Sequence, residues 1–369
     1  MKSFLLFFRE INWLIVAPAL LLVVYGLVVS YSLHAASEVP DFSGFWRQVG
    51  FAVVGVIFLF ALAASDYRFF KSWYVFFFVV AFVFLVAVLI FGQTIRGTRG
   101  WFVIFGITIQ AVEFVKLLVI IAFSGYLVRL KVSLARLQDL VISGAGVGVL
   151  VVLTFLQPDI GSGMLLLGIY AGMLLLVKTK KVYVFLLIFL LLFSSIVGWF
   201  FVLQDFHRDR VLTFLNPERD PLGVGYNLTQ SIIAVGSGKI FGRGLTLGPQ
   251  SRLEFLPEAQ NDFIFAVIAE ALGFAGVALL LLLFFTLFAQ ILRAARRARD
   301  DFGIILAGGI AVALLLQSVV NISTNLGLLP VAGLPLPFVS AGGSSLLVSL
   351  AGVGIVASID LRHRLGRVN

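Results

Sequence analysis

Long apolar segments separated by short polar connections make up most of this chain. They are centred near residues 22, 57, 82, 120, 148, 170, 192, 276, 311 and 352. An α-helix of about 20 apolar residues crosses the hydrocarbon core of a bilayer. The pattern therefore predicts an all-α, polytopic integral membrane protein with about ten transmembrane helices, in which residues 1–369 form a single transmembrane domain. The first segment, from Trp13 to about Ser32, is too long for the apolar part of a signal peptide, so we expect a retained anchor.

The composition supports this prediction and excludes some kinds of site. Hydrophobic residues are 61% of the 369, charged residues are 12%, and the mean hydropathy is +1.10. A soluble domain carries roughly 25% charged residues, so lipid must solvate much of this surface. Cysteine is absent, which excludes disulfides and thiolate metal sites. The three histidines, His34, His207 and His363, lack the spacing of metal ligands.

Basic residues set the expected orientation, and the net charge is +9. With ten crossings, most of them fall on one side of the membrane: Lys2, Arg9, Arg68, Lys71, Arg129, Lys131, Arg136, Lys178, Lys180, Lys181, Arg293, Arg296, Arg297, Arg299, Arg362, Arg364 and Arg367. By the positive-inside rule this side is cytoplasmic, and both termini lie there. The positive charge is thereby explained without a nucleic-acid partner.

A smaller group of basic residues falls on the predicted outer side and needs another explanation. Arg96 and Arg99 precede the fourth apolar segment, and a long outer loop at about 204–262 contains Arg208, Arg210, Arg219, Lys239, Arg243 and Arg252. A loop of this length is too long for a plain connection, which makes it a candidate for function. Within it, the helical spacing of Leu228, Ile232 and Val235 predicts a short helix in the plane of the membrane interface.

Glu113 and Lys116 lie inside the fourth apolar segment, three residues apart. At that spacing they share one helix face and can form an ion pair. Ionisable groups at membrane depth are costly and usually face a cavity or a partner. Two interpretations stay open: a functional pair, or a pair that only holds helices together.

Two aspartates stand where the chain breaks near the outer surface. Asp159, within QPDIGSG, follows a proline and precedes two glycines. Asp262, within LEFLPEAQNDFIFAVIAE, directly precedes an apolar helix, and Glu258 lies one turn earlier. For each aspartate we weigh a helix N-cap against a functional carboxylate, and for Asp262 the two interpretations are compatible.

The segment from Asn325 to Ser345 contains three prolines and four glycines, so it cannot form a regular transmembrane helix. Irregular backbone at membrane level is tolerated only where protein or a water-filled cavity covers it. Its backbone amides, together with Ser340, Ser344 and Ser345, are suited to an anionic headgroup. We therefore favour a functional interpretation of this segment.

In these motifs the chain resembles the SEDS family (shape, elongation, division and sporulation), the integral-membrane peptidoglycan glycosyltransferases. The resemblance extends nearly from end to end and is carried by RGTRGW, the helix with Glu113 and Lys116, QPDIGSG, RVLTFLNPERDPLGVGYN, LEFLPEAQNDFIFAVIAE and GLPLPFVSAGGSS. The motifs LEFLPE and PVAGLPLPF are more similar to those of the RodA branch than to those of the FtsW branch. The chain departs from the family at Gln260 and Asn261, where His-Thr is usual, at Ala271, where a second glutamate is usual, and at Ala111 and Val112, where Pro-Ser is usual.

The resemblance implies polymerisation of lipid II, an undecaprenyl-pyrophosphate-linked disaccharide-pentapeptide, at the outer face of the bacterial cytoplasmic membrane during cell elongation. It also implies a class B penicillin-binding protein as the transpeptidase partner. Such a reaction needs a carboxylate to take the proton of the attacking hydroxyl, and positive charge to stabilise the leaving pyrophosphate. We expect Asp262 to be the general base.

The remaining candidates are expected to bind substrate or pyrophosphate, or to line the cavity: Arg96, Arg99, Glu113, Lys116, Asp159, Arg208, Arg210, Lys239, Arg243, Glu258, Ser340 and Ser344. A divalent cation such as Mg²⁺ or Mn²⁺ is compatible with the chemistry, but the sequence predicts no ligand set for it. The alternative function is a lipid II flippase without polymerase activity, and a third is a scaffold that only recruits a cell-wall synthase.

Overall fold

The computed structural model describes residues 10–36, 41–95, 97–134, 136–183, 185–186, 205–220, 223–246, 248, 256 and 258–365. In this part of the chain eight helices are long and apolar enough to cross a membrane. They are α2 (Trp13–Ala36), α3 (Ser43–Ala64), α5 (Tyr74–Phe91), α6 (Ala111–Arg129), α7 (Leu137–Phe155), α13 (Ile264–Arg297), α14 (Asp301–Asn325) and α15 (Gly343–Leu365).

The predicted polytopic, all-α architecture is confirmed. The sixth predicted segment forms a shorter apolar helix, α8 (Ile160–Leu175). The seventh, centred near residue 192, lies outside the described residues. Each of the other predicted segments contains one of the eight long helices.

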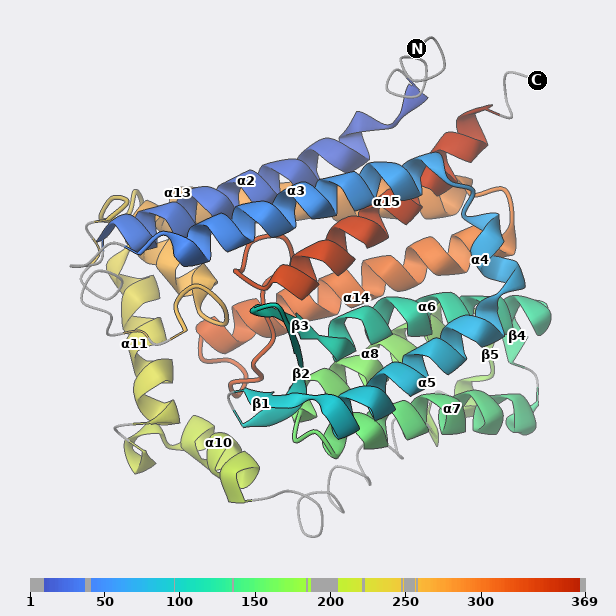
Figure 1. Ribbon diagram of the computed structural model, residues 1–369, viewed down its shortest axis with the longest axis horizontal. Helices are drawn as coiled ribbons and strands as arrows, with labels where there is room; N and C mark the ends of the chain where they lie inside the picture. The colour runs from blue at the N-terminus through green and yellow to red at the C-terminus, as the bar shows by residue number, and fades with distance from the viewer. Residues whose placement is uncertain are drawn as a thin grey trace.

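The long helices form one bundle, and further elements lie across one of its ends (Figure 1). We call this the loop end. It contains α10 (Asp205–Leu215), the 3₁₀ turn η2 (Pro217–Arg219) and α11 (Val224–Ser237). In Figure 1, α11 runs across the direction of the bundle, as expected for a helix in the interface plane.

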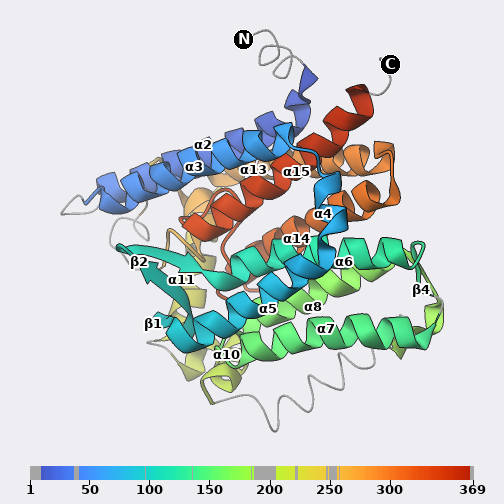
Figure 2. The same ribbon diagram turned by 45° about the vertical axis from the view of Figure 1, so that its right-hand side comes forward.

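A small antiparallel sheet also lies at the loop end (Figure 2), and it was not predicted from the sequence. Its strands are β1 (Gln93–Ile95), β2 (Thr98–Ile104) and β3 (Ile107–Gln110), in the order β1-β2-β3. In the β2–β3 pair Trp101 lies opposite Gln110. The sheet leads directly into α6 and so fixes where that helix begins.

The opposite end, which we call the basic end, contains α4 (Arg68–Ser72) and the short parallel strands β4 (Ser133–Leu134) and β5 (Lys178–Thr179). Several chain segments meet there. The hydroxyl of Tyr67 donates to Asp300 at 2.6 Å, and Arg362 near the end of α15 donates to the carbonyl of Ala64 at 2.9 Å. Within the described residues, predicted basic clusters thus lie together at this end.

The centre of the bundle is formed by α6, α14 and α15. In their most apolar stretches 72%, 61% and 83% of the residues are buried, against 17% in α5, which leaves most of the α5 surface to lipid. The segment between α14 and α15 is irregular, as predicted, and its apolar residues Leu334, Leu336 and Phe338 are buried. Protein therefore covers this non-helical backbone, as the physics of the bilayer requires.

The start of α8 packs directly against this irregular segment. A Cβ atom on Gly161 would overlap the carbonyl oxygen of Ala332, so only glycine allows the two backbones to approach so closely. This contact brings the QPDIGSG motif against PVAG, which lies about 170 residues later in the sequence. The two motifs are therefore parts of one structure.

Replacing Gly161 with alanine is expected to destabilise the protein, although alanine has the higher helix propensity, because the methyl group overpacks the contact with Ala332. We expect the free energy of unfolding to fall by about 1–3 kcal/mol. Gly148→Ala in α7 is the matched control, since no described atom lies within 4 Å of a Cβ at that position. Unfolding of the purified proteins in detergent measures both. Equal stability of the two variants would contradict the contact.

Candidate active site at the loop end

The site is built around Asp262, which lies in a turn before α13. The amides of Asn261 and Phe263 donate to the carbonyl of Glu258, at 2.9 and 3.4 Å, so the turn continues to Phe263 and the helix begins at Ile264. The interpretation of Asp262 as the N-cap of this helix is wrong, because Phe263 occupies the N-cap position.

The first turn of α13 is instead capped from another helix. The amide of Ala266, three residues after the N-cap position, donates to Oδ1 of Asn325 on α14 at 3.0 Å. An N-cap side chain normally accepts this hydrogen bond. Since Asn325 accepts it here, the carboxylate of Asp262 is not needed for capping.

Asp159, by contrast, is the N-cap of α8, and that interpretation is confirmed. Its Oδ1 accepts a hydrogen bond from the Ser162 amide at 3.0 Å, and its Oδ2 accepts one from the Ser162 hydroxyl at 2.8 Å. Gln110, at the end of β3, donates to the same carboxylate at 3.4 Å. Burial raises the pKa of Asp159, and the two hydrogen bonds from Ser162 act in the opposite direction.

Arg210 on α10 is influenced by the charges of both aspartates. Burial lowers the pKa of its guanidinium, and the charges of Asp262 and Asp159 oppose that effect. An arginine keeps its charge even when its pKa is lowered, so Arg210 is a fixed cation at this site.

Residues 331–333 of the irregular segment lie where these groups meet. Nη1 of Arg210 donates to the carbonyl of Val331 at 3.5 Å. Ala332 contacts the start of α8, next to Asp159, and Oδ2 of Asp262 is 3.9 Å from where a Cβ on Gly333 would lie. The structure thus brings together Asp262, Asp159 and Arg210, which are far apart in the sequence.

Ser340, Ser344 and Glu258 lie around this centre and hold its backbone. The hydroxyl of Ser340 donates to the carbonyl of Asn261 at 2.6 Å, and that of Ser344 accepts from the amide of Gln110 at 2.9 Å. The carboxylate of Glu258 accepts from the Asn261 side chain at 2.7 Å. These contacts are structural, and binding of a headgroup by the serines stays a prediction.

The other predicted cations lie in different surroundings. Arg99 donates to the carbonyls of Gly92 and Ile90 at 3.2 and 3.1 Å and so satisfies the C-terminal end of α5. Arg208 lies two residues before Arg210 on α10 and is half-buried. Arg96 lies outside the described residues.

Lys239 and Arg243 belong to a loop that packs against a break in α13. The break is at Gly273, with φ 63° and ψ −160°, and the amides of Phe274 and Ala275 donate to the loop carbonyls of Lys239 and Ile240 at 2.8 and 2.9 Å. Both basic side chains are exposed. At 1.5 Å per residue the break is roughly 15 Å along the helix from Asp262, so their binding of substrate stays a prediction.

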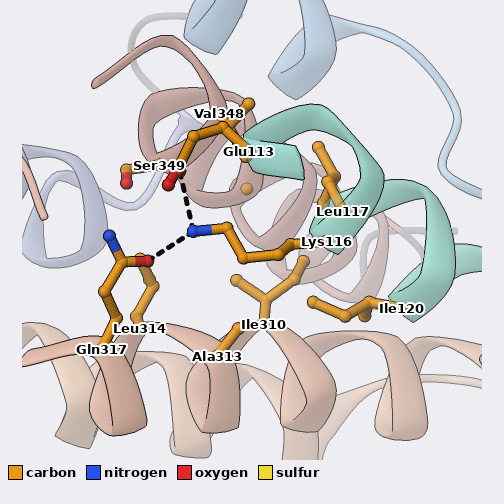
Figure 3. Close-up of a pocket in the computed structure, with 11 residues that line it drawn as sticks. Glu113, Lys116, Leu117, Ile120, Ile310, Ala313, Leu314, Gln317, Val348 and Ser349 are labelled. Atoms are coloured by element: carbon orange, nitrogen blue, oxygen red, sulfur yellow. Dashed lines mark hydrogen bonds and ion pairs between the residues drawn. The ribbon is translucent and has the colours of Figure 1, made fainter. Parts of the chain in front are cut away.

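The predicted pairing of Glu113 with Lys116 is confirmed at 2.7 Å, and both side chains are at most 5% exposed. Lys116 also donates to Oε1 of Gln317 on α14 at 2.7 Å (Figure 3). These side chains line a cavity of about 30 Å³ between α6, α14 and α15, which has room for a water molecule.

Sequence reasoning missed three amides on α14. Gln317, Asn321 and Asn325 recur every four residues, so they lie on one helix face, and all three are at most 4% exposed. Polar side chains spaced four residues apart in an otherwise apolar helix could have indicated this buried polar face. Among the described residues, no group of three or more His, Cys, Asp or Glu side chains is arranged to hold a metal ion.

Comparison with known proteins gives consistent results. The family described as "Cell cycle protein", with FtsW, RodA and SpoVE in its name, matches residues 12–365. The chain is 35% identical over 351 residues to the peptidoglycan glycosyltransferase MrdB of Escherichia coli (strain K12), which covers 94% of each chain. It is 37% identical over 354 residues to the probable peptidoglycan glycosyltransferase FtsW of Trichlorobacter lovleyi, covering 92% of this chain and 91% of that one.

Two solved structures share the fold. One is a chain from work on the coordination of polymerization and crosslinking by a peptidoglycan synthase complex, with a TM-score of 0.79, 28% identity and coverage of 96% of this chain and 98% of that one. The other is the rod shape determining protein RodA of Thermus thermophilus, with a TM-score of 0.69, 26% identity and coverage of 96% and 97%.

The buried pair on α6 gives a testable prediction. Lys116→Met leaves the Glu113 carboxylate buried without its ion-pair partner, so we expect it to cost about 3–5 kcal/mol of unfolding free energy. The double variant Glu113→Gln, Lys116→Met removes both charges, and its loss is expected to be smaller than the sum of the two single losses. Unfolding in detergent measures Lys116→Met, Glu113→Gln and the double variant, with exposed Lys71→Met as the control. Strictly additive losses would contradict a direct interaction.

Proposed function

The chain belongs to the FtsW/RodA/SpoVE family of cell cycle proteins, and we propose that it is a peptidoglycan glycosyltransferase that polymerises lipid II into glycan strands. The observation that carries the proposal is that residues 331–333 lie beside Arg210, beside the start of α8 next to Asp159, and beside Asp262. A carboxylate beside a fixed cation, in a protein that spans a membrane, suits glycosyl transfer from a lipid-linked pyrophosphate.

In the proposed reaction Asp262 is the general base. A hydroxyl oxygen of the acceptor sugar forms a bond to the anomeric carbon of the donor, and the bond from that carbon to the pyrophosphate oxygen breaks. The hydroxyl proton passes to the Asp262 carboxylate, and undecaprenyl pyrophosphate leaves with the bonding electrons. A base must lie within about 2.6–3.2 Å of the proton-bearing oxygen for this step.

We assign Arg210 the role of binding the leaving pyrophosphate. Negative charge develops on the pyrophosphate oxygens as the bond from the anomeric carbon to the pyrophosphate oxygen breaks, and a guanidinium matches phosphate oxygens with two parallel hydrogen bonds. Partial burial strengthens this attraction because the local dielectric is low. Asp159 is fixed at the start of α8 and attracts the same guanidinium, so we assign it the role of holding Arg210 in place.

The protein is a multi-pass membrane protein, and we propose that its loop end faces outward from the bacterial cytoplasmic membrane. The support is the positive-inside rule, applied to the basic clusters at the opposite end of the bundle. Both termini would then be cytoplasmic and the site extracytoplasmic. Donor and acceptor lipids would reach the site from the outer leaflet.

We further propose a class B penicillin-binding protein as the partner and a role in cell elongation. The support for the partner is the similarity of this chain to one in a peptidoglycan synthase complex that coordinates polymerization and crosslinking. The relatives named MrdB and FtsW have nearly equal sequence identity to this chain, 35% and 37%. The assignment to the RodA branch therefore rests on the LEFLPE and PVAGLPLPF motifs.

The proposal predicts that Asp262→Asn abolishes polymerisation, because an amide cannot take the hydroxyl proton. With labelled lipid II in liposomes and the partner present, we expect the rate of polymer formation to fall at least about 100-fold. Asp301→Asn is the matched control: Asp301 is exposed in the first turn of α14, at the basic end, and the rate should not change.

The same assay separates the alternatives. A flippase would move labelled lipid II across the bilayer without making polymer, and Asp262→Asn would leave that movement intact. A scaffold would allow normal wall synthesis in cells that carry Asp262→Asn. Either result, with a folded variant that still binds its partner, would contradict the proposed function.

A further inference from the structure

The three amides on α14 form a continuous series of hydrogen bonds to irregular backbone. Gln317 accepts from Lys116 and donates to the carbonyl of Pro335 at 2.8 Å. One turn later, Asn321 donates to the carbonyl of Leu334 at 2.8 Å. The series continues with Asn325, and we call these three residues the α14 amide ladder.

Two members of the ladder bind the same atom of the proposed catalytic residue. The side-chain amides of Asn321 and Asn325 both donate to the backbone carbonyl of Asp262, at 2.9 and 2.8 Å. Both asparagines are at most 2% exposed, so water does not compete for these bonds. The carbonyl of Asp262 is thereby held from two adjacent turns of one helix.

The orientation of the Asn325 amide follows from its neighbours. Its Oδ1 accepts from the amide of Ala266, and its Nδ2 donates to the carbonyl of Asp262. A flipped amide would place two N–H groups against each other and two oxygens against each other. Asn325 therefore fixes the distance between Asp262 and the first turn of α13 with one rigid group.

Such anchoring affects the carboxylate because an aspartate side chain is short. With two rotatable bonds between backbone and carboxylate, the reach and direction of the acid are set mainly by the position of its Cα atom. Sites of this kind need their reacting groups held within roughly 0.5 Å. A misplacement of about 1 Å can lower a catalytic rate about 100-fold.

We propose that Asn321 and Asn325 are positioning residues that hold the Asp262 carboxylate in place for the acceptor hydroxyl. This inference deepens the proposed function and rests on it. Gln317 extends the ladder to the Glu113–Lys116 pair. This buried pair therefore acts on the site through the backbone of residues 334–335 rather than by contact with substrate.

Steady-state kinetics test the proposal. Asn321→Leu, of similar size, removes both donors of Asn321 and leaves the cap on Ala266 intact. Per folded, monodisperse protein we expect kcat to fall about 10-fold or more, with KM for lipid II within about 2-fold, because only the chemical step depends on the position of the base. Asn325→Leu should act in the same direction.

Ser318→Ala is the matched control. Ser318 is buried on α14, one residue after Gln317, and its hydroxyl donates to the carbonyl of Leu314 in its own helix at 2.8 Å. Because this hydrogen bond stays within α14, removing the hydroxyl should leave the Asp262 turn in place and kcat unchanged. If Asn325→Leu does not fold, because it also removes the cap of α13, Asn321→Leu alone decides the outcome.

A second measurement reads the position of residue 262 without enzymatic activity. Because the chain has no cysteine, Asp262→Cys gives a single site for a nitroxide label. We expect an immobile label in the otherwise unchanged chain and with Ser318→Ala, and a mobile label with Asn321→Leu. Electron paramagnetic resonance of the protein in liposomes reports the difference.

The two measurements keep the failures apart. An immobile label in Asn321→Leu, or a kcat equal to that of the Ser318→Ala control, would overturn the positioning role. If the unchanged chain makes no polymer while the label responds as expected, the proposed function fails and the hold of Asn321 on residue 262 stands.

Discussion

Backbone groups that leave a helix within a membrane must find hydrogen-bond partners inside the protein, because lipid supplies none. In this protein that constraint acts on two segments, the turn before α13 and the irregular segment between α14 and α15. The amides of Gln317, Asn321 and Asn325 serve both at once, by binding the carbonyls of Pro335, Leu334 and Asp262. The arrangement of the site depends on this shared set of donors.

Once the irregular segment is fixed, the charged groups have defined places around it. Residues 331–333 bind Arg210, pack against the start of α8 and lie beside Asp262, so one short stretch of backbone is the common neighbour of three charged residues. Gly161 permits the close approach of α8, and Gly333 adopts the positive φ of 68° that this stretch requires. The site is therefore a property of the packing between α8, α10, α13 and the α14–α15 connection, and no single motif contains it.

Much of this could be predicted from the sequence where the cause is local. Span length and hydropathy predicted the helices, and the three-residue spacing predicted the Glu113–Lys116 pair. Proline and glycine content predicted the irregular segment, and Asp159 caps its helix as its position suggested. Each of these features depends on residues within a few positions of one another.

The rest depends on contacts between distant parts of the chain. The N-cap interpretation of Asp262 was wrong because Asn325, 59 residues after Ala266, caps α13 in its place. The strands β1–β3 are too short for a periodic signal, and Arg99 is used to satisfy the end of α5. The amides of α14 were missed because each looks like an isolated polar residue until the opposing backbone is known.

The central claim is that Asp262 and Arg210 act on one lipid-linked substrate at the loop end. A structure of the Asp262→Asn variant, in complex with its transpeptidase partner and two lipid II molecules or analogues, tests it most directly. The account predicts an acceptor hydroxyl oxygen within about 3.2 Å of the residue 262 side chain, and donor pyrophosphate oxygens bound by Arg210. A pyrophosphate bound instead beside Lys116, in the middle of the bundle, would contradict the account.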